Sequence, residues 1–415
     1  MLARGIAACA AALVVLTAPV ARAQAPGITL ADALRRAAEL NPDIRTAEAE
    51  VAAARGGLRG ARLLTYNVEL LGGLGRVTGA DTSFTGYEIG LSQRFELGGK
   101  RGWRIRAAEQ RVTAAEARLA RRREEVAARV SRTFLLGLIA RMRSGAAREG
   151  EQVAAQLRSA ADERLALGAG TQLEVNVATA SASRERRARL EAERAYASSV
   201  IDLASAIGLP PTELAEPEGE PTLPPADTRT ETELVAAALE RRADLRAAVA
   251  EREAAGADFG FARGLAWPDP AIGAALSRED NRFWQVTVSL PLPLWNRGQG
   301  ARAEARAGLE RARIAEAALR RQVELEVRDA YQAYQRAREA QAGFDRDLVE
   351  RLAENLQLAE ESFRAGKIGL LIFNTVRRDL VEGQLAYLDA LGDVVERQAV
   401  LQLAIGDTGG SVNER

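Results

Sequence analysis

The chain is 415 residues long and carries 57 basic and 57 acidic side chains, so its formal net charge is zero. It contains no histidine, and its one cysteine is Cys9, near the N-terminus. These counts exclude histidine-dependent triads, and they exclude thiol nucleophiles and most zinc sites once the N-terminal segment is removed. No basic block interrupts the balanced charge, which argues against a nucleic-acid partner. We therefore expect neither an enzyme nor a cofactor or metal site.

Residues 1–23 have the pattern of a secretory signal peptide. An apolar run follows Arg4 and ends before a small-residue cleavage site, Ala-Arg-Ala at 21–23. We expect cleavage before Gln24, and we expect no lipid anchor because Cys9 does not lie at the cleavage point. No later stretch approaches 18 consecutive apolar residues, so no transmembrane helix is predicted.

The mature chain reads as a tandem duplication. NPDIRTAEAE at 41–50 parallels RADLRAAVAE at 242–251, and AIGL near residue 206 parallels AIGD near residue 404. Proline is missing between Pro42 and Pro210 and again after Pro293, which permits long helices in both stretches. The predicted organisation is a first repeat over 24–209, a proline-rich segment over 210–230, a second repeat over 231–406 and a C-terminal tail over 407–415.

Each repeat is predicted to contain two short helices, two strands, a long helix and a returning helix. In the first repeat these are helices over 30–39 and 42–62, strands near 66–75 and 84–97, and helices over 101–167 and 171–207. In the second repeat the strands lie near 270–277 and 283–292, and the later helices lie over 302–363 and 370–405. At 1.5 Å per residue, the long helix of the first repeat is ~100 Å long and each returning helix is ~55 Å long.

The predicted strands alternate between apolar residues and small or polar ones. In GYEIGLSQRFEL the apolar side chains share one face, and in FWQVTVSLPL Val286 and Val288 oppose Thr287 and Ser289. A soluble hairpin packed on a core would explain one such pair, but strands of this kind also fit an outer-membrane barrel. The signal peptide favours the barrel, as do four tryptophans that all fall in or beside the hairpins, as an aromatic belt requires. We expect the two valines to face lipid and Thr287 and Ser289 to face the pore.

The number of strands requires association between copies of the chain. Four strands cannot close a barrel, and an open edge in lipid leaves backbone groups without partners. Two copies give eight strands, a barrel that side chains fill, whereas three copies give twelve and leave a lumen. We therefore predict a homotrimer in contact with outer-membrane lipid.

The corners between a strand and the following long helix resemble those of a known family. LSQRFELGGKR, LPLPLWNRGQG and the opening LNPDIRTAEAEVAAARG are similar to the TolC family of outer-membrane efflux channels, and the two corners look like those of its heavy-metal efflux (CzcC-like) branch. The corner residues are Gly98, Gly99, Lys100, Asn296, Arg297 and Gly298. The resemblance covers nearly the full mature length. It implies a mainly α fold with a small β part, in which two tandem structural repeats supply long helical hairpins for an α-barrel. Four strands per protomer then contribute to a trimeric 12-stranded outer-membrane β-barrel.

The turns between long and returning helices resemble the family's periplasmic tips, where a periplasmic adaptor (membrane fusion) protein docks. The docking residues that this implies are Leu167, Gly168, Ala169, Ala365, Gly366 and Lys367. A sharp reversal needs glycine in any case, so plain hairpin turns without a partner are the alternative. Glu174 takes the place of an acidic residue near the pore entrance. Ile368 stands where the family has a basic gate residue, and Ile372 and Thr375 stand where it has aspartates. A constriction made by Ile368, Leu371 or Ile372 is an alternative gate, because apolar constrictions can close a pore by dewetting.

These features predict the passive exit duct of a tripartite efflux pump in the outer membrane of a Gram-negative bacterium. The adaptor would join the duct to an inner-membrane pump of the resistance-nodulation-division (RND) type, and heavy-metal cations are the first expected cargo. The alternative is the same channel exporting drugs, other organic compounds or a type I secretion polypeptide. A periplasmic coiled-coil scaffold without a pore is the third hypothesis, and conductance in planar bilayers separates it from the other two.

Overall fold

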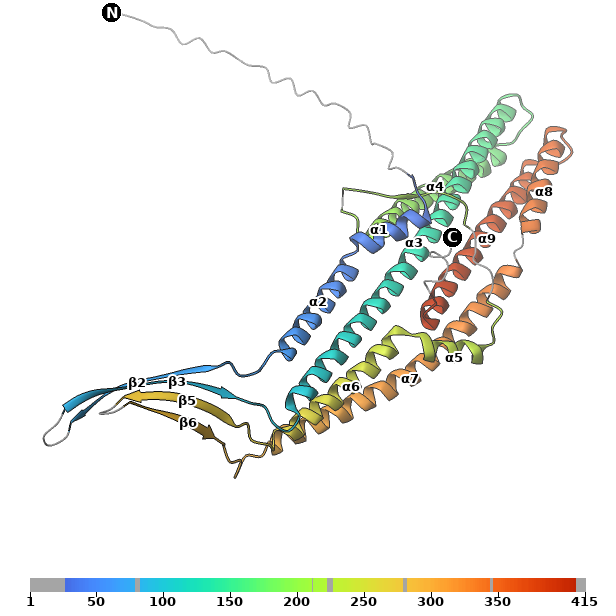
Figure 1. The fold of residues 1–415 in the computed structure, drawn as a ribbon. Helices are drawn as coiled ribbons and strands as arrows, with labels where there is room; N and C mark the ends of the chain where they lie inside the picture. Colours follow the sequence, from blue (N-terminus) through green and yellow to red (C-terminus); the bar gives the residue numbers. More distant parts are fainter. Residues whose placement is uncertain are drawn as a thin grey trace, which may run out of the picture.

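The computed structural model describes residues 27–78, 83–210, 212–221, 227–278, 282–343 and 346–407. The predicted signal peptide and residues 408–415 of the predicted tail lie outside these ranges. The described part of the chain is elongated. A four-stranded sheet occupies one end, and long helices run from it to two helical tips at the other end (Figure 1).

The elements of the two halves follow the same order along the chain, except that two helices stand in the second half where the first half has one long helix alone. The first half contains β1 (Gly27–Ile28), α1 (Leu30–Leu40), α2 (Pro42–Arg62), β2 (Glu69–Thr78), β3 (Ser83–Arg94), α3 (Lys100–Ala166) and α4 (Gln172–Ile207). The second contains β4 (Glu216–Pro217), α5 (Glu231–Arg241), α6 (Ala243–Gly264), β5 (Ala271–Arg278), β6 (Arg282–Ser289), α7 (Gln299–Ala342), α8 (Arg346–Arg364) and α9 (Leu370–Ile405). β1 and β4 pair in parallel, which ties the segment between the repeats to the start of the described chain.

Several helix ends are set by residues that cap the first turn of a helix or allow the left-handed backbone conformation after its last turn. Asn41 caps α2 with its side chain, and Pro42 occupies the first turn, where it has no backbone hydrogen bond to lose. Gly208 and Gly406 follow α4 and α9 with positive φ angles of 87° and 78°. Glycine tolerates this left-handed conformation, which ends a helix sharply. Both returning helices therefore end at equivalent positions in their repeats.

The core consists of separate clusters along the helices, two of which occupy equivalent places in the repeats. One cluster joins α1 to α3 and α4 and includes the fully buried Leu203 and Ile207. Its counterpart joins α5 to α7 and α9 and includes the fully buried Leu234 and Val327. Burying each such side chain stabilises the fold by ~1.5–3 kcal/mol. These clusters hold each short helix against the long helix and the returning helix of its own repeat.

The four longer strands form one antiparallel sheet in the order β2-β3-β5-β6. β3 pairs with β5 over a register that places Ile89 opposite Leu276 and Arg94 opposite Ala271, so the two repeats meet in the middle of the sheet. β2 and β6 lie at its edges, and within the described residues neither pairs with another strand along its outer side. Each repeat thus supplies one hairpin to a single open sheet.

The prediction of a single helix over 302–363 is wrong, because the structure has two helices in this range. α7 ends at Ala342, where the backbone N–H of Gly343 donates to the carbonyl groups of Ala340 and Gln341. Glycine is a poor helix former, which accounts for an end at this point. α8 then begins at Arg346.

Several strand ends also differ from the expected positions. β2 continues to Thr78, past the predicted 75, and β3 ends at Arg94, short of the predicted 97. β2 begins at Glu69, not near residue 66, because the side chain of Tyr66 belongs to the corner and donates a hydrogen bond to Asp269. β6 ends at Ser289, short of the predicted 292, since the prolines that follow cannot donate to a strand ladder.

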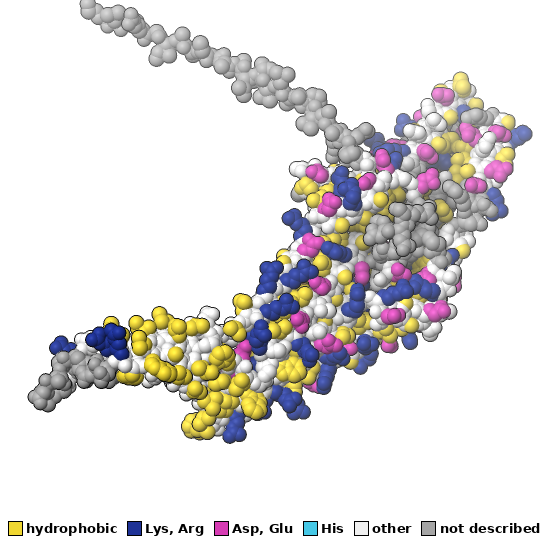
Figure 2. Space-filling view, in the orientation of Figure 1, with side chains coloured by type: hydrophobic (Ala, Val, Ile, Leu, Met, Phe, Trp, Pro, Cys, Tyr) yellow, Lys and Arg dark blue, Asp and Glu magenta, His cyan; other side chains and the backbone are white. Residues whose placement is uncertain are grey.

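Charged side chains dominate the surface of the helices, whereas hydrophobic side chains gather at the strand end of the molecule (Figure 2). Pairs such as Arg55–Glu116 and Arg123–Glu48 link α2 to α3 across exposed faces. Exposed ion pairs of this kind contribute only ~0–1 kcal/mol each. No helix in the described ranges is both long enough and apolar enough to cross a membrane.

Candidate functional site

One face of the four-stranded sheet is apolar and exposed. Residues directly opposite each other on paired strands share a face, and the register aligns Ile89 with Leu276 and Leu276 with Trp284. Leu74 is 86% exposed and Trp284 is 77% exposed. The large exposed side chains of this apolar face are Leu70, Leu74, Ile89, Leu91, Ile272, Leu276, Trp284, Val286 and Val288. A patch of this extent indicates contact with an apolar partner or with lipid, because soluble monomers rarely expose one.

The opposite face of the sheet, which we call the polar face, carries mainly small and polar side chains. They include Glu88, Gly90, Ser92, Gly273, Gln285, Thr287 and Ser289. Across this face, Nε2 of Gln285 donates to Oε1 of Glu88 at 3.2 Å. Leu71 and Phe283 depart from the alternation.

The four β6 residues from which the two faces were predicted lie on opposite faces of the sheet in the structure, two on each face. Val288 lies opposite Ile272 and therefore on the apolar face, and Val286 lies on the same side. Thr287 lies opposite Gly273 on the polar face, together with Ser289. All four are exposed in the single chain. The assignment of one face to lipid and the other to the pore remains a prediction.

One of the four tryptophans expected to form an aromatic belt, Trp103, packs between helices instead. Trp103 packs against α6, where a Cβ added to Gly260 would lie 2.5 Å from its ring. Because glycine leaves this space, Trp103 fills the angle between α3 and α6 and does not extend from the sheet. Trp267, Trp284 and Trp295 are exposed near the strand end.

The first corner, which contains Gly98, Gly99 and Lys100, brings the two repeats together. Gly98 and Gly99 have φ angles of 70° and 71°, a conformation that favours glycine. The turn directs Lys100 inward, where it is only 5% exposed. Its Nζ donates to Oδ1 of Asp269 at 2.7 Å and to the carbonyl oxygen of Trp267 at 2.8 Å. Lys100, which the sequence analysis named only as a corner residue, is thus a buried contact between repeats.

Asp269 is the centre of this corner. Its carboxylate also accepts hydrogen bonds from the backbone N–H of Leu97 at 3.0 Å and from the hydroxyl of Tyr66 at 3.1 Å. Burial opposes ionisation of Asp269, but the hydrogen bonds from Lys100 and Leu97 outweigh it and hold its pKa below the ordinary value. Burial and the neighbouring carboxylate together raise the pKa of Tyr66. The corner is therefore built around an ionised carboxylate with three donors.

The second corner, which contains Asn296, Arg297 and Gly298, is bonded mainly within itself. Oδ1 of Asn296 accepts from the backbone N–H of Gly298 at 3.0 Å, and Oε1 of Gln299 accepts from that of Arg297 at 2.7 Å. Gly298 has a φ angle of 73° and precedes α7 as Gly99 precedes α3. Arg297 is exposed, in contrast to the buried Lys100.

The first tip joins α3 to α4 through Leu167, Gly168 and Ala169. Gly168 has a φ angle of 72°, and the backbone N–H of Ala169 closes the turn onto the carbonyl group of Arg164 at 2.9 Å. Leu167 is 83% exposed at the end of the molecule. Glu174 forms a capping box with Thr171, in which each side chain accepts a hydrogen bond from the other residue's backbone N–H. Glu174, which was predicted to lie near the pore entrance, is half-buried and also starts α4.

The second tip joins α8 to α9 through Ala365, Gly366 and Lys367, all of which are exposed. Gly366 has a φ angle of 72°, matching Gly168. Ile368 packs against the core cluster of the tips, which includes Phe373 and Leu157. The candidate gate residues on the first turns of α9 that remain exposed are Leu371, Ile372 and Thr375.

A buried arginine that sequence analysis did not single out ties the two helical hairpins together. Arg377 of α9 is 3% exposed and donates to Oε1 of Glu185 on α4 at 2.9 Å. It also donates to the carbonyl oxygen of Gly150 on α3 at 3.3 Å and to the hydroxyl of Ser181 at 3.1 Å. Phe373, four residues earlier, is buried on the same face of α9. An arginine at helical spacing from buried apolar residues is the signal that could have identified this contact.

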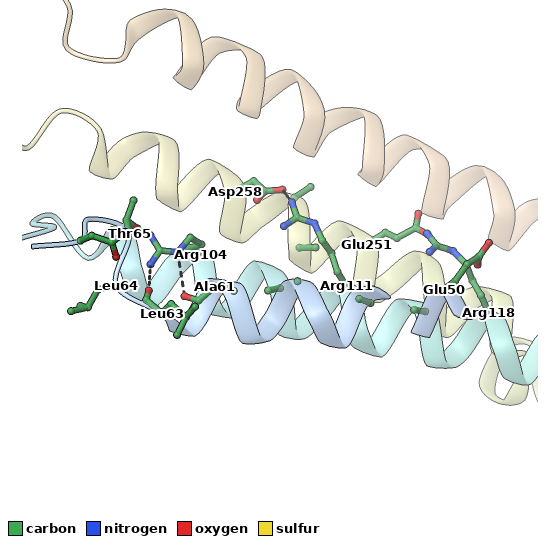
Figure 3. Close-up of a pocket in the computed structure, with 18 residues that line it drawn as sticks. Glu50, Ala61, Leu63, Leu64, Thr65, Arg104, Arg111, Arg118, Glu251 and Asp258 are labelled. Carbon is green, nitrogen blue, oxygen red and sulfur yellow. Dashed lines mark hydrogen bonds and ion pairs between the residues drawn. The ribbon is translucent and has the colours of Figure 1, made fainter. Parts of the chain in front are cut away.

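An open groove of about 1230 Å³ runs along α3 between α2 and α6. Figure 3 shows Arg111 and Arg118 of α3 extending toward Asp258 and Glu251 of α6. Arg104 binds the end of α2 through the carbonyl oxygens of Ala61 and Leu63. The groove wall thus combines small side chains with balanced ion pairs. Among the described residues, no group of three or more acidic side chains is placed to hold a metal ion.

Comparison with known proteins gives one family match to each repeat. The model of the outer membrane efflux protein family matches residues 33–209 and 234–407. The cobalt-zinc-cadmium resistance protein CzcC of Cupriavidus metallidurans is 28% identical over 392 residues, which cover 94% of this chain and 92% of CzcC. The pyoverdine export outer membrane protein OpmQ of Pseudomonas putida is 26% identical over 263 residues, which cover 59% of this chain and 52% of OpmQ.

Solved structures show the same architecture. CusC, whose crystal structures concern folding and transmembrane channel formation, superposes with a TM-score of 0.74 at 17% identity and covers 92% of both chains. The outer membrane channel MtrE of Neisseria gonorrhoeae, in its open state, gives a TM-score of 0.74 at 19% identity and covers 93% of this chain and 91% of MtrE. The mainly helical fold with its small sheet is that of TolC-like outer-membrane channels and not of an enzyme. The chain belongs to the outer membrane efflux protein family.

Proposed function

We propose that three copies of this chain form a channel through the outer membrane and that this channel is the passive exit duct of a tripartite efflux pump. The observation that carries the proposal is an open sheet with one apolar and one polar face. In lipid, each unpaired backbone group at a sheet edge costs several kcal/mol. β2 of one protomer therefore pairs with β6 of the next, until the ring closes.

The width of the ring selects the number of copies. Two copies supply eight strands, whose interior is filled by side chains, whereas three copies supply twelve and leave an aqueous lumen. In the trimer the apolar face meets lipid and the polar face lines the pore. Glu88, Gln285 and Thr287 then provide the wet surface that a conduit needs.

The helices extend the duct into the periplasm. α3 has 67 residues, which span ~100 Å at 1.5 Å per residue. The two tips lie at the far end from the sheet (Figure 1). Their exposed glycines and alanines let another backbone approach closely, and the exposed Leu167 and Lys367 flank them. We therefore assign the adaptor-docking surface to Leu167, Gly168, Ala169, Ala365, Gly366 and Lys367. The adaptor connects this end to an inner-membrane pump of the RND type.

The pore entrance lies at the start of the returning helices in this proposal. Leu371 and Ile372 are 70% and 55% exposed, and three copies of each would form an apolar constriction that closes by dewetting. Ile368 supports this segment from the core of the tips and does not itself form the constriction. Three copies of Glu174 add a ring of carboxylates whose field favours cations.

Heavy-metal cations are the substrate class that we propose for this duct. The support comes from CzcC, a cobalt-zinc-cadmium resistance protein that matches this chain over nearly its whole length. A conduit must bind its cargo weakly enough to release it. The second candidate is export of organic compounds, which the partial match to the pyoverdine export protein OpmQ favours.

A deletion strain tests the function and separates the two cargo classes. We expect loss of the gene to lower the concentrations of zinc, cobalt or cadmium that stop growth and to leave those of organic toxicants unchanged. Wild-type protein restores resistance. We expect the Gly366→Trp variant not to restore resistance, because the bulky side chain at the tip blocks the adaptor. Its trimers and its conductance in bilayers should stay intact. Sensitivity to organic compounds alone would favour the second candidate, and a strain with unchanged sensitivity to both classes would contradict the exit-duct proposal.

A further inference from the structure

At the strand end, Arg104 and Glu96 form an ion pair within the first repeat, with side chains that are 23% and 9% exposed. The ion pair between Lys100 and Asp269 differs from it because it joins the two repeats. Its two side chains are 6% and 13% exposed, and it joins the start of α3 in the first repeat to the residue two positions before β5 in the second. Most helix-surface pairs of this protein involve arginines that are about half exposed. A buried pair is costly to desolvate and is strongly disrupted when one partner is removed. Its burial therefore points to a positional role.

Asp269 extends the pairing of β3 with β5 beyond the strands. The ladder ends with Arg94 opposite Ala271. The backbone N–H of Phe95 then donates to the carbonyl oxygen of Pro270 at 2.9 Å, and that of Leu97 donates to the side chain of Asp269. The carboxylate takes the place of the next carbonyl group in the ladder. Lys100, bound to the same carboxylate, thereby attaches the end of the ladder to the first residue of α3.

The glycines of this corner bring the two repeats into close contact. A Cβ added to Gly98 would lie 2.8 Å from the Trp267 ring and 2.9 Å from the carbonyl oxygen of Gly264. A Cβ added to Gly264 would lie 3.0 Å from Cγ of Lys100. The angle between sheet and helices is therefore held by backbone packing as well as by the ion pair.

The positions that match Asp269 and Lys100 in the opposite repeats carry no charge. The repeat alignment places Val68 where the second repeat has Asp269, and Val68 is 59% exposed. After the left-handed glycine that precedes each long helix, the first repeat has Lys100 and the second has Gln299. The side chain of Gln299 bonds within its own loop. In a ring of protomers, this second corner is the one that faces the neighbouring chain.

We propose that Lys100 and Asp269 are positioning residues that set the sheet at its angle to the helices within each protomer before protomers associate. The proposal rests on the trimeric channel of the proposed function. A sheet fixed in advance presents the β2 and β6 edges in the orientation that closure requires, and this lowers the ordering cost of assembly. The corner between protomers lacks such a pair and adjusts as the ring closes.

Assembly of purified variants in detergent tests this role. Lys100→Met leaves the carboxylate buried without its cation, and we expect it to lower the yield of trimer roughly tenfold or more. The helical circular dichroism of the monomer should persist, because the clusters that hold the helices lie elsewhere. Lys100→Met combined with Asp269→Asn removes both charges and should recover much of the yield. Arg55→Met removes the cation of an exposed ion pair between α2 and α3 and should assemble as the wild type does.

The outcomes separate this inference from the proposed function. Wild-type protein that fails to trimerise would overturn the channel itself. Wild-type trimers together with normal trimer yield in Lys100→Met would overturn only the positioning role. Loss of helical signal along with the trimer in Lys100→Met would also overturn it, because the pair would then support the whole fold.

Discussion

The two repeats have the same order of elements but differ at both ends of their long helices. In the first, α3 runs unbroken for 67 residues, begins at a buried ion pair and leads to a tip with a capping box. In the second, α7 has 44 residues and ends at Ala342, and α9 begins at Leu370 after Gly369, which offers no side-chain cap. From this difference we expect the first repeat to be the more rigid frame. In the proposed channel, we expect the second repeat to move when the entrance opens.

One contact opposes such movement. Arg377 ties α9 of the second repeat to α3 and α4 of the first, and with a side-chain exposure of 3% it cannot exchange its partners for water. Opening the entrance by moving α9 therefore requires this network to break or to move as a unit. The predictions below test the contrast between a rigid and a movable repeat, from the largest expected effect to the smallest.

Replacing Arg377 should have the largest effect on stability. Arg377→Met leaves Glu185 without its partner, and removal of one member of a buried pair costs about 3–5 kcal/mol. We expect a lower unfolding temperature and a larger resting conductance in bilayers, because α9 is released from the first repeat. Arg378→Met, at an exposed neighbour, should change neither. A closed, fully stable Arg377→Met channel would show that the tie does not restrain the second repeat.

The repeats should behave alike inside the membrane, where both contribute a two-faced hairpin. Val288→Arg, with its side chain in lipid near mid-membrane, should cost ~2–4 kcal/mol, whereas Thr287→Arg in the lumen should cost much less. Leu91→Arg and Ser92→Arg make the same comparison in the first repeat. The measurement is denaturant unfolding of folded protein in lipid vesicles. Equal tolerance at Val288 and Thr287 would mean that the faces are assigned wrongly.

The tips should respond in opposite directions to changes at the helix starts. Thr171→Ala removes the cap of α4 and should destabilise the first tip by about 1 kcal/mol. Gly369→Ser supplies a cap to α9 in an extended conformation that serine adopts freely, and should stabilise the second tip by a few tenths of a kcal/mol. Hydrogen exchange of the backbone amides in the first turns of α4 and α9 reports both changes. Faster exchange of the α9 amides in the Gly369→Ser variant would show that the missing cap does not limit the stability of the second tip.

The smallest effect is expected from Glu174→Gln. Glutamine preserves the capping-box pattern, so the tip should stay folded while the carboxylate ring of the trimer is lost. Single-channel recordings should then show a weaker preference for cations over anions. An unchanged preference would leave Glu174 with the capping role alone, in which an acidic residue also suits the positive end of α4.

Sequence patterns were sufficient for features that depend on neighbours along the chain. The alternation around Val288 and the tip glycines are local features of this kind. The Thr171–Glu174 capping box is also local, but the sequence analysis did not identify it. The burial of Lys100 could not be predicted in this way, because Asp269 reaches it only through the register of β3 with β5. Arg377 was missed for a similar reason: its partners lie on two helices from the other repeat. The break after Ala342 could not be predicted from Gly343 alone, because α3 runs unbroken through Gly137, Gly145 and Gly150.

The number of chains in the assembled protein tests the central claim most directly. Native mass measurement of the folded, detergent-solubilised protein should give a complex of three chains, as the two open edges of the four-stranded sheet and the need for a lumen require. A stable monomer or dimer would contradict the account, because neither would enclose an aqueous channel.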